Sequence, residues 1–250
     1  MEFADALGLG RDELVAFVGA GGKKTAMASL VEAGGARGLA VGYTTTTHTP
    51  PPADAPLVLA APERLEEALA RAGSPVAFAA ERVPDPDRAE RKVRGYDPDV
   101  VADLHERGRF DWLLAKADGA RRREFKAPGP DEPVVPAAAT HIVPVASVRA
   151  VGRPLSAPTV HRPERVAAIT GAAVGDELTP ETVGTVLAST EGGLKGVPAD
   201  ATVTPVVNKA DTPTLRERAR EAVTVAFEGS KRVSRGLVTS FRTDYLECLA

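Results

Sequence analysis

One short stretch of the sequence combines glycines, lysines and a hydroxyl side chain in an order that suits phosphate binding. Glycines let the backbone approach an anion closely, because they adopt positive φ angles that other residues avoid. Backbone N–H groups at the start of a helix then point at the phosphates, and a lysine adds a full positive charge. The residues that this pattern assigns to a nucleotide are Gly19, Ala20, Gly21, Gly22, Lys23, Lys24 and Thr25.

This stretch departs from the standard phosphate-loop pattern G-x-x-x-x-G-K-[ST]. With Gly22-Lys23 as the G-K pair, the first glycine position falls on Phe17 and the hydroxyl position on Lys24. With Lys24-Thr25 as the K-[ST] pair, Lys23 takes the place of the glycine. A glycine-rich turn with surface lysines is therefore an alternative. A dinucleotide-binding turn is disfavoured, because it requires a glycine at position 24.

An aspartate at the end of a second apolar run is the candidate metal ligand. Residues 112–117 are followed by Asp118-Gly119, and phosphate-binding folds hold Mg²⁺ with a carboxylate at such a strand tip. We predict that Thr25 and Asp118 bind Mg²⁺ and that Lys23 and Asp118 are the catalytic pair, since phosphoryl transfer needs mainly positioning and charge neutralisation. Four cations follow within residues 121–126, which indicates either a further anion contact or a solvated loop.

A third group, Asn208-Lys209-Ala210-Asp211, follows an apolar run at 201–207. In guanine-nucleotide proteins the pattern N-K-x-D reads the base: the Asp accepts from guanine N–H groups, the Asn supports the loop, and the Lys stem packs on the ring. We predict nucleotide-binding roles for Asn208, Lys209 and Asp211. The alternative is that Asn208 and Asp211 cap the helix that follows, at 214–227.

Four threonines at 44–47 follow a predicted strand and precede three prolines at 50–52. Open α/β sheets place ligands at the carboxyl ends of their strands, so these hydroxyl groups are candidates for contacts to phosphate or Mg²⁺. The alternative is an edge strand whose threonines have no role in binding, since β-branched residues suit strands.

Strands and helices alternate along the chain and must position these groups. Strands are predicted at 14–18, 39–43, 57–61, 76–80, 112–117, 141–148 and 201–207, with a last strand at 231–239. Helices are predicted near 1–12 and at 23–35, 62–72, 97–107, 165–170, 179–189 and 214–227, and a charged connection or hairpin at 81–96. The alternation predicts one α/β domain over residues 1–250, a P-loop-like three-layer fold with a mostly parallel sheet and helices on both faces.

Composition limits the class of protein. The 250 residues are 43% hydrophobic and 26% charged, as expected of a globular chain. The net charge of −3 implies neither polyanion-binding nor strongly acidic character, and we expect no nucleic acid as partner. No apolar run is long enough for a membrane span or a signal peptide, so we expect a cytoplasmic protein. Cys248 is the single cysteine, which excludes a disulfide within the chain, and the four histidines are too scattered to predict a metal site.

Taken together, the motifs resemble the YqeC family of selenium-dependent hydroxylase accessory proteins. The segments that carry the resemblance, in the family's order, are 18–23, 44–48, 117–120, 126–128, 132–136, 152–155, 160–164, 191–196 and 208–211. The resemblance implies a nucleotide-binding α/β protein linked to the maturation of molybdenum hydroxylases. Two residues depart from the family pattern: Lys24 stands at the hydroxyl position of the loop, and Lys116 stands where the family has Glu. Both departures weaken the case for Mg²⁺ and for activation of water.

Three functions follow from these observations. The first is a Mg²⁺-dependent protein that binds GTP or ATP and acts as a nucleoside triphosphate hydrolase or phosphotransferase. The second is a non-catalytic carrier of a nucleotide-bearing molybdenum cofactor, which Lys116 and the cations at 121–126 favour because they suit a large polyanion. The third is a small-molecule kinase that uses the same loop. The sequence leaves the three open.

Overall fold

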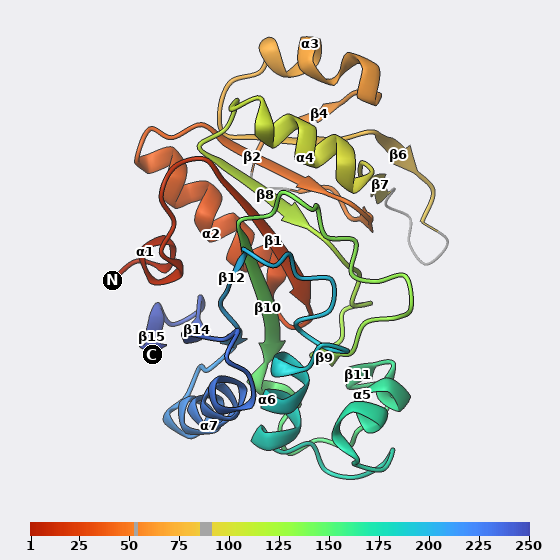
Figure 1. Cartoon of the computed structure of the whole chain (residues 1–250), viewed down its shortest axis with the longest axis vertical. Coiled ribbons are helices and arrows are strands. Elements are labelled where there is room, and N and C mark those ends of the chain that lie inside the picture. Colours follow the sequence, from red (N-terminus) through yellow and green to blue (C-terminus); the bar gives the residue numbers. More distant parts are fainter. Residues whose placement is uncertain (53–54, 86–91) are drawn as a thin grey trace.

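The computed structural model describes residues 1–52, 55–85 and 92–250, and one large sheet forms its centre (Figure 1). The strand order is β15-β14-β13-β10-β1-β8-β2-β5-β4, and β12 pairs with β10. Every pairing in this sheet is parallel except that of β14 with β15. The strands are β1 (Glu13–Gly19), β2 (Val41–Thr45), β4 (Leu57–Leu59), β5 (Val76–Ala79), β8 (Trp112–Lys116), β10 (His141–Ser147), β12 (Thr202–Val203), β13 (Val206–Asn208), β14 (Gly236–Ser240) and β15 (Tyr245–Leu249).

Helices cover both faces of the sheet, which confirms the predicted three-layer α/β fold. The helices are α1 (Phe3–Leu7), α2 (Lys23–Ala36), η1 (Pro62–Arg64), α3 (Leu65–Ala70), α4 (Pro98–Glu106), η2 (Val148–Ala150), α5 (Pro163–Thr170), α6 (Pro180–Ala188) and α7 (Pro213–Gly229). In Figure 1, α3 and α4 lie at one end of the molecule and α5, α6 and α7 at the other.

Alternation along the strands explains the layers, since successive side chains of a strand point to opposite faces. In β1, Val15 and Phe17 pack with Met27 of α2, whereas Leu14 and Ala16 belong to the core on the other face. All four side chains are fully buried. A strand that is buried on both faces is apolar throughout, and that is why the run at 14–18 shows no alternation of polar residues.

Two small sheets lie outside the main one. In the first, β7 (Lys92–Arg94) pairs antiparallel with both β3 (His48–Thr49) and β6 (Glu81–Val83). This confirms a hairpin in the charged connection, of which residues 86–91 lie outside the described residues. In the second, β9 (Phe125–Lys126) pairs in parallel with β11 (Val160–His161).

Three local predictions differ from the structure. The strand predicted at 201–207 is divided into β12 and β13, because Pro205 has no N–H group to donate to the ladder. The strand predicted at 231–239 begins only at Gly236, and the turn after it leads into β15, which the sequence pattern did not indicate. Finally, β2 lies between β8 and β5, so the alternative that its threonines belong to an edge strand is wrong.

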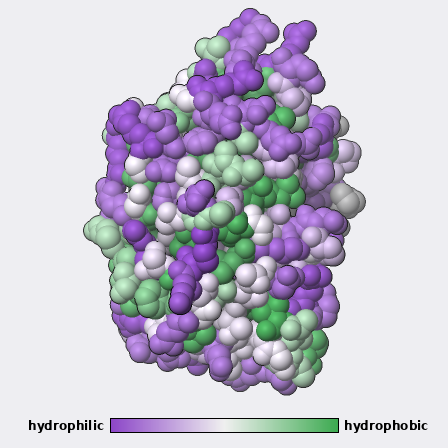
Figure 2. All heavy atoms as spheres, in the orientation of Figure 1, coloured by the Kyte–Doolittle hydropathy of each residue, from purple (hydrophilic) through white to green (hydrophobic). Residues whose placement is uncertain are grey.

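The surface is polar with scattered apolar side chains. Figure 2 shows hydrophilic residues around the outline of one face and hydrophobic residues toward its middle. Among the described residues, Leu59 of β4 and Phe227 of α7 are the exposed large apolar side chains within regular elements, at 40% and 43% exposure. None of the helices described in the structure combines the length and the apolar character needed to cross a bilayer.

Candidate functional site

The predicted site residues lie along one edge of the main sheet. Strands β13, β10, β1, β8 and β2 are parallel neighbours, so their carboxyl ends meet at the same edge. A cleft of about 1140 Å³ lies there. Its lining includes eight cationic side chains and, among the described residues, one carboxylate, Asp85. The cations are Lys23, Lys24, Lys92, Lys116, Arg121, Arg122, Arg123 and Lys209. The arrangement therefore favours an anionic ligand.

The glycine loop joins β1 to α2 in a conformation that requires glycine, as Gly19 and Gly22 illustrate. Gly19 has φ 90°, and a Cβ there would lie 2.3 Å from the carbonyl oxygen of Val145. Gly22 has φ 142°, and a Cβ there would lie 2.1 Å from the amide nitrogen of Asn208. Ala20 is buried, and its backbone N–H donates to the Val145 carbonyl at 2.8 Å. These contacts hold the loop against the neighbouring strand β10.

Helix α2 begins directly after the loop, with Gly22 as its N-cap residue. The cap provides no side chain to bind the first N–H groups, and the first turn holds no acidic residue. An oxyanion at this helix start would meet backbone donors, the positive end of the helix dipole and the lysines of the first turn. Lys24 is half-buried, with its Nζ 3.4 Å from the carbonyl oxygen of Pro51, while Thr25 is exposed at the edge of the cleft.

Lys23 and Asp118, the predicted catalytic pair, are in direct contact. The Lys23 Nζ lies 2.7 Å from Asp118 Oδ1, and the two side chains are 5% and 1% exposed. The Lys23 ammonium also donates to the carbonyl oxygen of Gly19, whose N–H donates to Asp118 Oδ2 at 2.7 Å. Burial alone would raise the pKa of Asp118, but the charges of Lys23 and Lys126 hold that pKa below its ordinary value.

The ion pair extends into a buried cluster. Lys126 of β9 places its Nζ 3.0 Å from Asp118 Oδ2 and 2.7 Å from Glu132 Oε2. Glu132 in turn accepts from Arg162 at 2.7 Å. With Lys116, the cluster contains four cations and two carboxylates, so positive charge is in excess. Because uncompensated buried charge is unfavourable, an anion in the adjoining cleft would stabilise the whole cluster.

Lys116 is a buried lysine whose pKa lies far below its ordinary value. It ends β8, is 7% exposed, and donates to the backbone carbonyl of Asp118 at 2.6 Å. Burial, together with the charges of Lys23 and Lys126, lowers the pKa of Lys116 to about 7. The side chain therefore changes its charge near neutral pH, at the floor of the cleft.

The described residues do not offer a ready Mg²⁺ site. Both oxygens of Asp118 face ammonium groups, and a cation would have to displace them. Thr25, the second predicted ligand, is exposed on α2, whereas Asp118 is buried. In the described part of the chain, no three His, Cys, Asp or Glu residues gather closely enough to hold a metal ion. The donor set thus favours neutralisation of an anion by lysine and arginine.

The turn Asn208–Asp211 uses its polar groups internally. Asn208 donates its side-chain N–H to the Gly21 carbonyl at 3.2 Å and accepts from Thr239 at 3.1 Å, so it braces the glycine loop. Asp211 accepts from Ser240 Oγ at 2.6 Å and forms an ion pair with Arg149. The helix that follows is capped by the Thr212 hydroxyl, so the alternative that Asn208 and Asp211 cap it is wrong.

Lys209 is the member of this turn that lines the cleft. Its backbone has φ 67°, and its Nζ lies 2.7 and 2.9 Å from the two carboxylate oxygens of Glu124. The aliphatic stem of such a lysine offers an apolar surface on which a planar base can stack, while the charge stays paired.

The threonine hydroxyls at 44–47 are used within the fold. Thr44, Thr45 and Thr46 each donate to a backbone carbonyl, at 2.9, 2.7 and 2.6 Å. Thr47 lies 3.4 Å from the Lys116 Nζ and so helps to hold that lysine. The described residues of this segment that line the cleft come later, at His48 and Thr49, followed by the three prolines.

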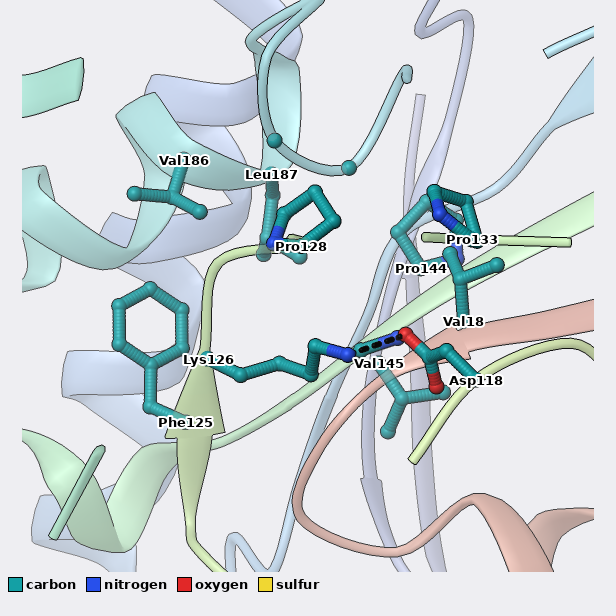
Figure 3. Close-up of a pocket in the computed structure, with 13 residues that line it drawn as sticks. Val18, Asp118, Phe125, Lys126, Pro128, Pro133, Pro144, Val145, Val186 and Leu187 are labelled. Atoms are coloured by element: carbon teal, nitrogen blue, oxygen red, sulfur yellow. Dashed lines mark hydrogen bonds and ion pairs between the residues drawn. The ribbon is translucent and has the colours of Figure 1, made fainter. Parts of the chain in front are cut away.

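A second, much smaller cavity lies behind the ion cluster. Figure 3 shows Lys126 reaching across it to Asp118, with Val18, Pro128 and Leu187 among the surrounding apolar side chains. Its volume is about 20 Å³, enough for about one water molecule but not for a nucleotide. The apolar lining of this cavity covers the Lys126–Asp118 pair, whose two side chains are each 1% exposed.

Two groups of charged residues at the candidate site were not assigned to it from the sequence. Glu132 and Arg162 lie in the segments 132–136 and 160–164, which carry the family resemblance, but no pattern in those segments assigned either side chain to the site. Asp85 and Lys92 lie 3.0 Å apart in the hairpin region, which read as a charged surface connection. Local sequence carries no signal for either pairing, because the packing of strands and loops decides which charged side chains meet, as for Arg162 and Glu132, which are 30 positions apart.

Comparison with known proteins agrees with the motifs. Residues 15–164 match the family described as YqeC protein. The uncharacterized protein YqeC of Escherichia coli (strain K12) is 31% identical over 190 residues, which cover 75% of this chain and 72% of that protein.

Proposed function

The chain belongs to the YqeC family, and we propose that this member binds a nucleoside triphosphate, GTP or ATP, through its glycine loop. The phosphates occupy the start of α2, beside Lys23, and the base lies toward β13 over the stem of Lys209. Mg²⁺ accompanies the nucleotide in solution, and no step of the proposal depends on a protein-bound metal.

One observation carries this proposal: the glycine loop opens onto a cleft whose buried floor holds more cations than carboxylates. Four of the six charged side chains in the Lys23–Asp118 cluster and its extension are cationic. Phosphate oxygens bring the missing negative charge, and charge-assisted hydrogen bonds from lysine are short and strong. A polyphosphate is the class of ligand that matches the glycine loop, the start of α2 and the excess of positive charge together.

The residues also support a role in catalysis. On arrival of the terminal phosphate, Lys23 exchanges a contact with Asp118 for a phosphate oxygen, and Asp118 remains paired with Lys126. Lys116 then lies beside the phosphate as a proton donor or acceptor, because its pKa is about 7. General acid–base groups are most effective when their pKa lies near the working pH.

Isothermal titration of the full chain with GTP, ATP, guanosine and inorganic tripolyphosphate tests the proposal. The triphosphates and tripolyphosphate are expected to bind with similar affinity, and guanosine at least 100-fold more weakly, since the phosphates supply most of the contacts. The absence of binding by every phosphate compound at millimolar concentration contradicts it. Release of inorganic phosphate, measured on the same samples, decides whether the bound nucleotide is hydrolysed.

A second candidate function is that of a carrier for a nucleotide-bearing molybdenum cofactor, with a molybdenum hydroxylase as client. The observation that favours it is Lys116: a buried lysine at a position suited to a carboxylate supports retention of a polyanion more than activation of water. Co-purification with a molybdenum hydroxylase, without nucleotide turnover, distinguishes the carrier from a hydrolase. A small-molecule kinase predicts release of nucleoside diphosphate only when an acceptor is added.

A further inference from the structure

Three consecutive arginines, Arg121–Arg123, line the cleft just after β8. Among the described residues, their side chains have no hydrogen-bond or ion-pair partner. The other cations of the lining differ: Lys23 pairs with Asp118, and Lys92 pairs with Asp85, the single carboxylate among the described lining residues. The arginines are therefore the cationic groups of this wall that are available to a ligand.

The backbone of this loop is held in an unfavourable conformation. Arg121 and Arg122 have φ of 46° and 61°, in the left-handed region that residues with a Cβ rarely adopt. The loop is fixed on both sides. The Lys126 ammonium donates to the carbonyl of Gly119 at 2.7 Å, and the Arg123 N–H donates to Ala120 at 2.8 Å. Backbone strain that the surrounding structure maintains is common at ligand-binding loops.

The order of the strands places the arginines beyond the nucleotide phosphates. Lys209 follows β13, the glycine loop follows β1, and the arginines follow β8, with β10 between the first two. At about 4.8 Å per strand, the arginine loop lies roughly 14 Å from the Lys209 end of the cleft. If the base lies over Lys209 and the phosphates at the glycine loop, the terminal phosphate points toward the arginines.

The cleft has room for more than one small molecule. Its volume of about 1140 Å³ exceeds the roughly 300–1,000 Å³ that is typical of a pocket for one ligand. The part near β3 and β7 is lined by His48, Lys92 and the prolines at 50–52. No carboxylate of the described lining other than Asp85 opposes a second anion there.

We propose that Arg121–Arg123 form a subsite for a second, phosphorylated small molecule, which binds together with the nucleotide and meets its terminal phosphate beside Lys116. The inference rests on the proposed nucleotide site and adds the class of its second substrate. Arginine suits this role because its planar guanidinium group binds phosphate through two parallel hydrogen bonds.

The test is a titration of inorganic pyrophosphate into the full chain saturated with a non-hydrolysable GTP or ATP analogue. We expect one further equivalent to bind, and we expect R121Q/R122Q/R123Q to weaken this binding at least 30-fold while changing nucleotide affinity less than threefold. The matched control is R64Q/R71Q/R107Q, which removes the same charge from side chains outside the cleft and is expected to change neither affinity.

Three results overturn the subsite: no pyrophosphate binding to the nucleotide complex, competition between the two ligands, or equal binding to the arginine variant. Competition indicates a single extended polyanion that occupies both regions. If no nucleotide binds at all, the proposed function fails, and pyrophosphate is titrated into the free protein. A site that is lost in the arginine variant then still supports the subsite, and pyrophosphate binding that is unchanged in this variant rejects it.

Discussion

The glycine loop at 19–25 and the turn Asn208–Asp211 follow two parallel strands of the same sheet, yet they use their polar groups in opposite ways. The loop presents the start of α2 to the cleft, together with lysines whose positive charge the neighbouring carboxylates balance only in part. In the turn, both oxygens of Asp211 are engaged by Arg149 and Ser240, and Asn208 holds the loop itself. Two motifs of similar strength in the sequence therefore differ in the structure: the turn braces the fold, and the loop is the element that we propose binds the ligand.

This difference shows how a motif is to be judged once a structure exists. A group is available for a ligand when the fold leaves its hydrogen-bonding capacity or its charge unsatisfied. A buried group that is already satisfied would have to give up its partner within the protein in order to bind a ligand. By that criterion Asp211 is a structural residue, whereas we propose as binding elements the arginine loop and the Lys23 region, where Asp118 alone is shared by two ammonium groups. The predictions below test this division, in order of decreasing effect.

The largest effect is expected for Lys23→Met. Loss of this ammonium removes the charge that faces the phosphates, so GTP and ATP affinity should fall at least 100-fold, about 2.7 kcal/mol at 25 °C. Isothermal titration measures the change. Lys209→Met is the matched control in the turn, and we expect it to weaken binding less than threefold, because among the described residues Glu124 pairs with that lysine alone whereas Asp118 is shared by Lys23 and Lys126.

The proposed difference between the loop and the turn is contradicted if Lys209→Met weakens nucleotide binding as much as Lys23→Met does. Because Lys23 also neutralises the buried Asp118, urea unfolding of each variant accompanies the titration. Lys23→Arg keeps the charge and serves if Lys23→Met does not fold. Its bulkier guanidinium group should still bind nucleotide at least tenfold more weakly than the wild type, because Lys23 is 5% exposed and has little room.

Asp211→Ala tests the turn directly. Arg149 and Ser240 lose their acceptor, so we expect the free energy of unfolding to fall by about 1–2 kcal/mol. The ratio of GTP to ATP affinity is expected to change less than threefold, because the carboxylate is engaged within the fold. A loss of GTP preference without a loss of stability would show that Asp211 reads guanine after all.

The third prediction concerns pH and Lys116. Its pKa of about 7 means that it is charged at pH 6 and neutral at pH 8.5. Raising the pH over this range should therefore weaken tripolyphosphate binding to the wild type by up to about tenfold more than it weakens binding to Lys116→Met. The variant lacks the titrating side chain, so its pH profile reports only the titration of the ligand. Parallel pH profiles for the two proteins would exclude a role of Lys116 in binding.

The free energy of unfolding should also depend on the titration of Lys116, but it should rise with pH where ligand affinity falls. The unfolded chain binds a proton at Lys116 below its ordinary pKa of 10.5, whereas the folded protein binds it only below about 7. Between these values the unfolded state binds more protons, so the free energy of unfolding rises as pH increases from 7 toward 10.5. Urea unfolding at pH 7 and pH 9.5 should show this rise in the wild type and a smaller rise in Lys116→Met.

The smallest effect is expected for removal of Mg²⁺. Lysine and arginine side chains supply the charge that opposes the phosphates, and Asp118 is occupied by two ammonium groups. Addition of EDTA should therefore lower nucleotide affinity by less than about threefold in a titration at constant ionic strength. A decrease of 30-fold or more would restore Asp118 and Thr25 as metal ligands, with Asp118→Asn as the confirming variant.

Net charge proved a poor guide to the surface of this protein. The chain carries −3 overall, which by itself implies no polyanion-binding character, yet eight cations and one carboxylate line the cleft among the described residues. Electrostatic attraction acts over about 10 Å at ordinary salt, so a ligand experiences the local charges and not their sum over the chain. Composition thus constrains solubility far better than it constrains a binding site.

The sequence by itself determined the elements whose causes are local. The apolar run before Gly19, the glycines after it and the Ala-rich segment that follows predicted β1, the loop and α2, because strand burial, positive φ and helix propensity act over a few residues. The α/β class followed from the same alternation. The tip of β8 at Asp118 was also found, since an apolar run that ends in Asp-Gly is a local signal.

Only the tertiary structure decided which polar groups are free. Glu132 and Lys126 join Asp118 because β9 and its loop pack beside the end of β8, and Arg149 reaches Asp211 across 62 positions of the chain. A charged side chain in a sequence gives its type but not its partner, and the partner sets its pKa and its availability to a ligand. Folding therefore makes Asp211 a brace and leaves Arg121–Arg123 facing the cleft.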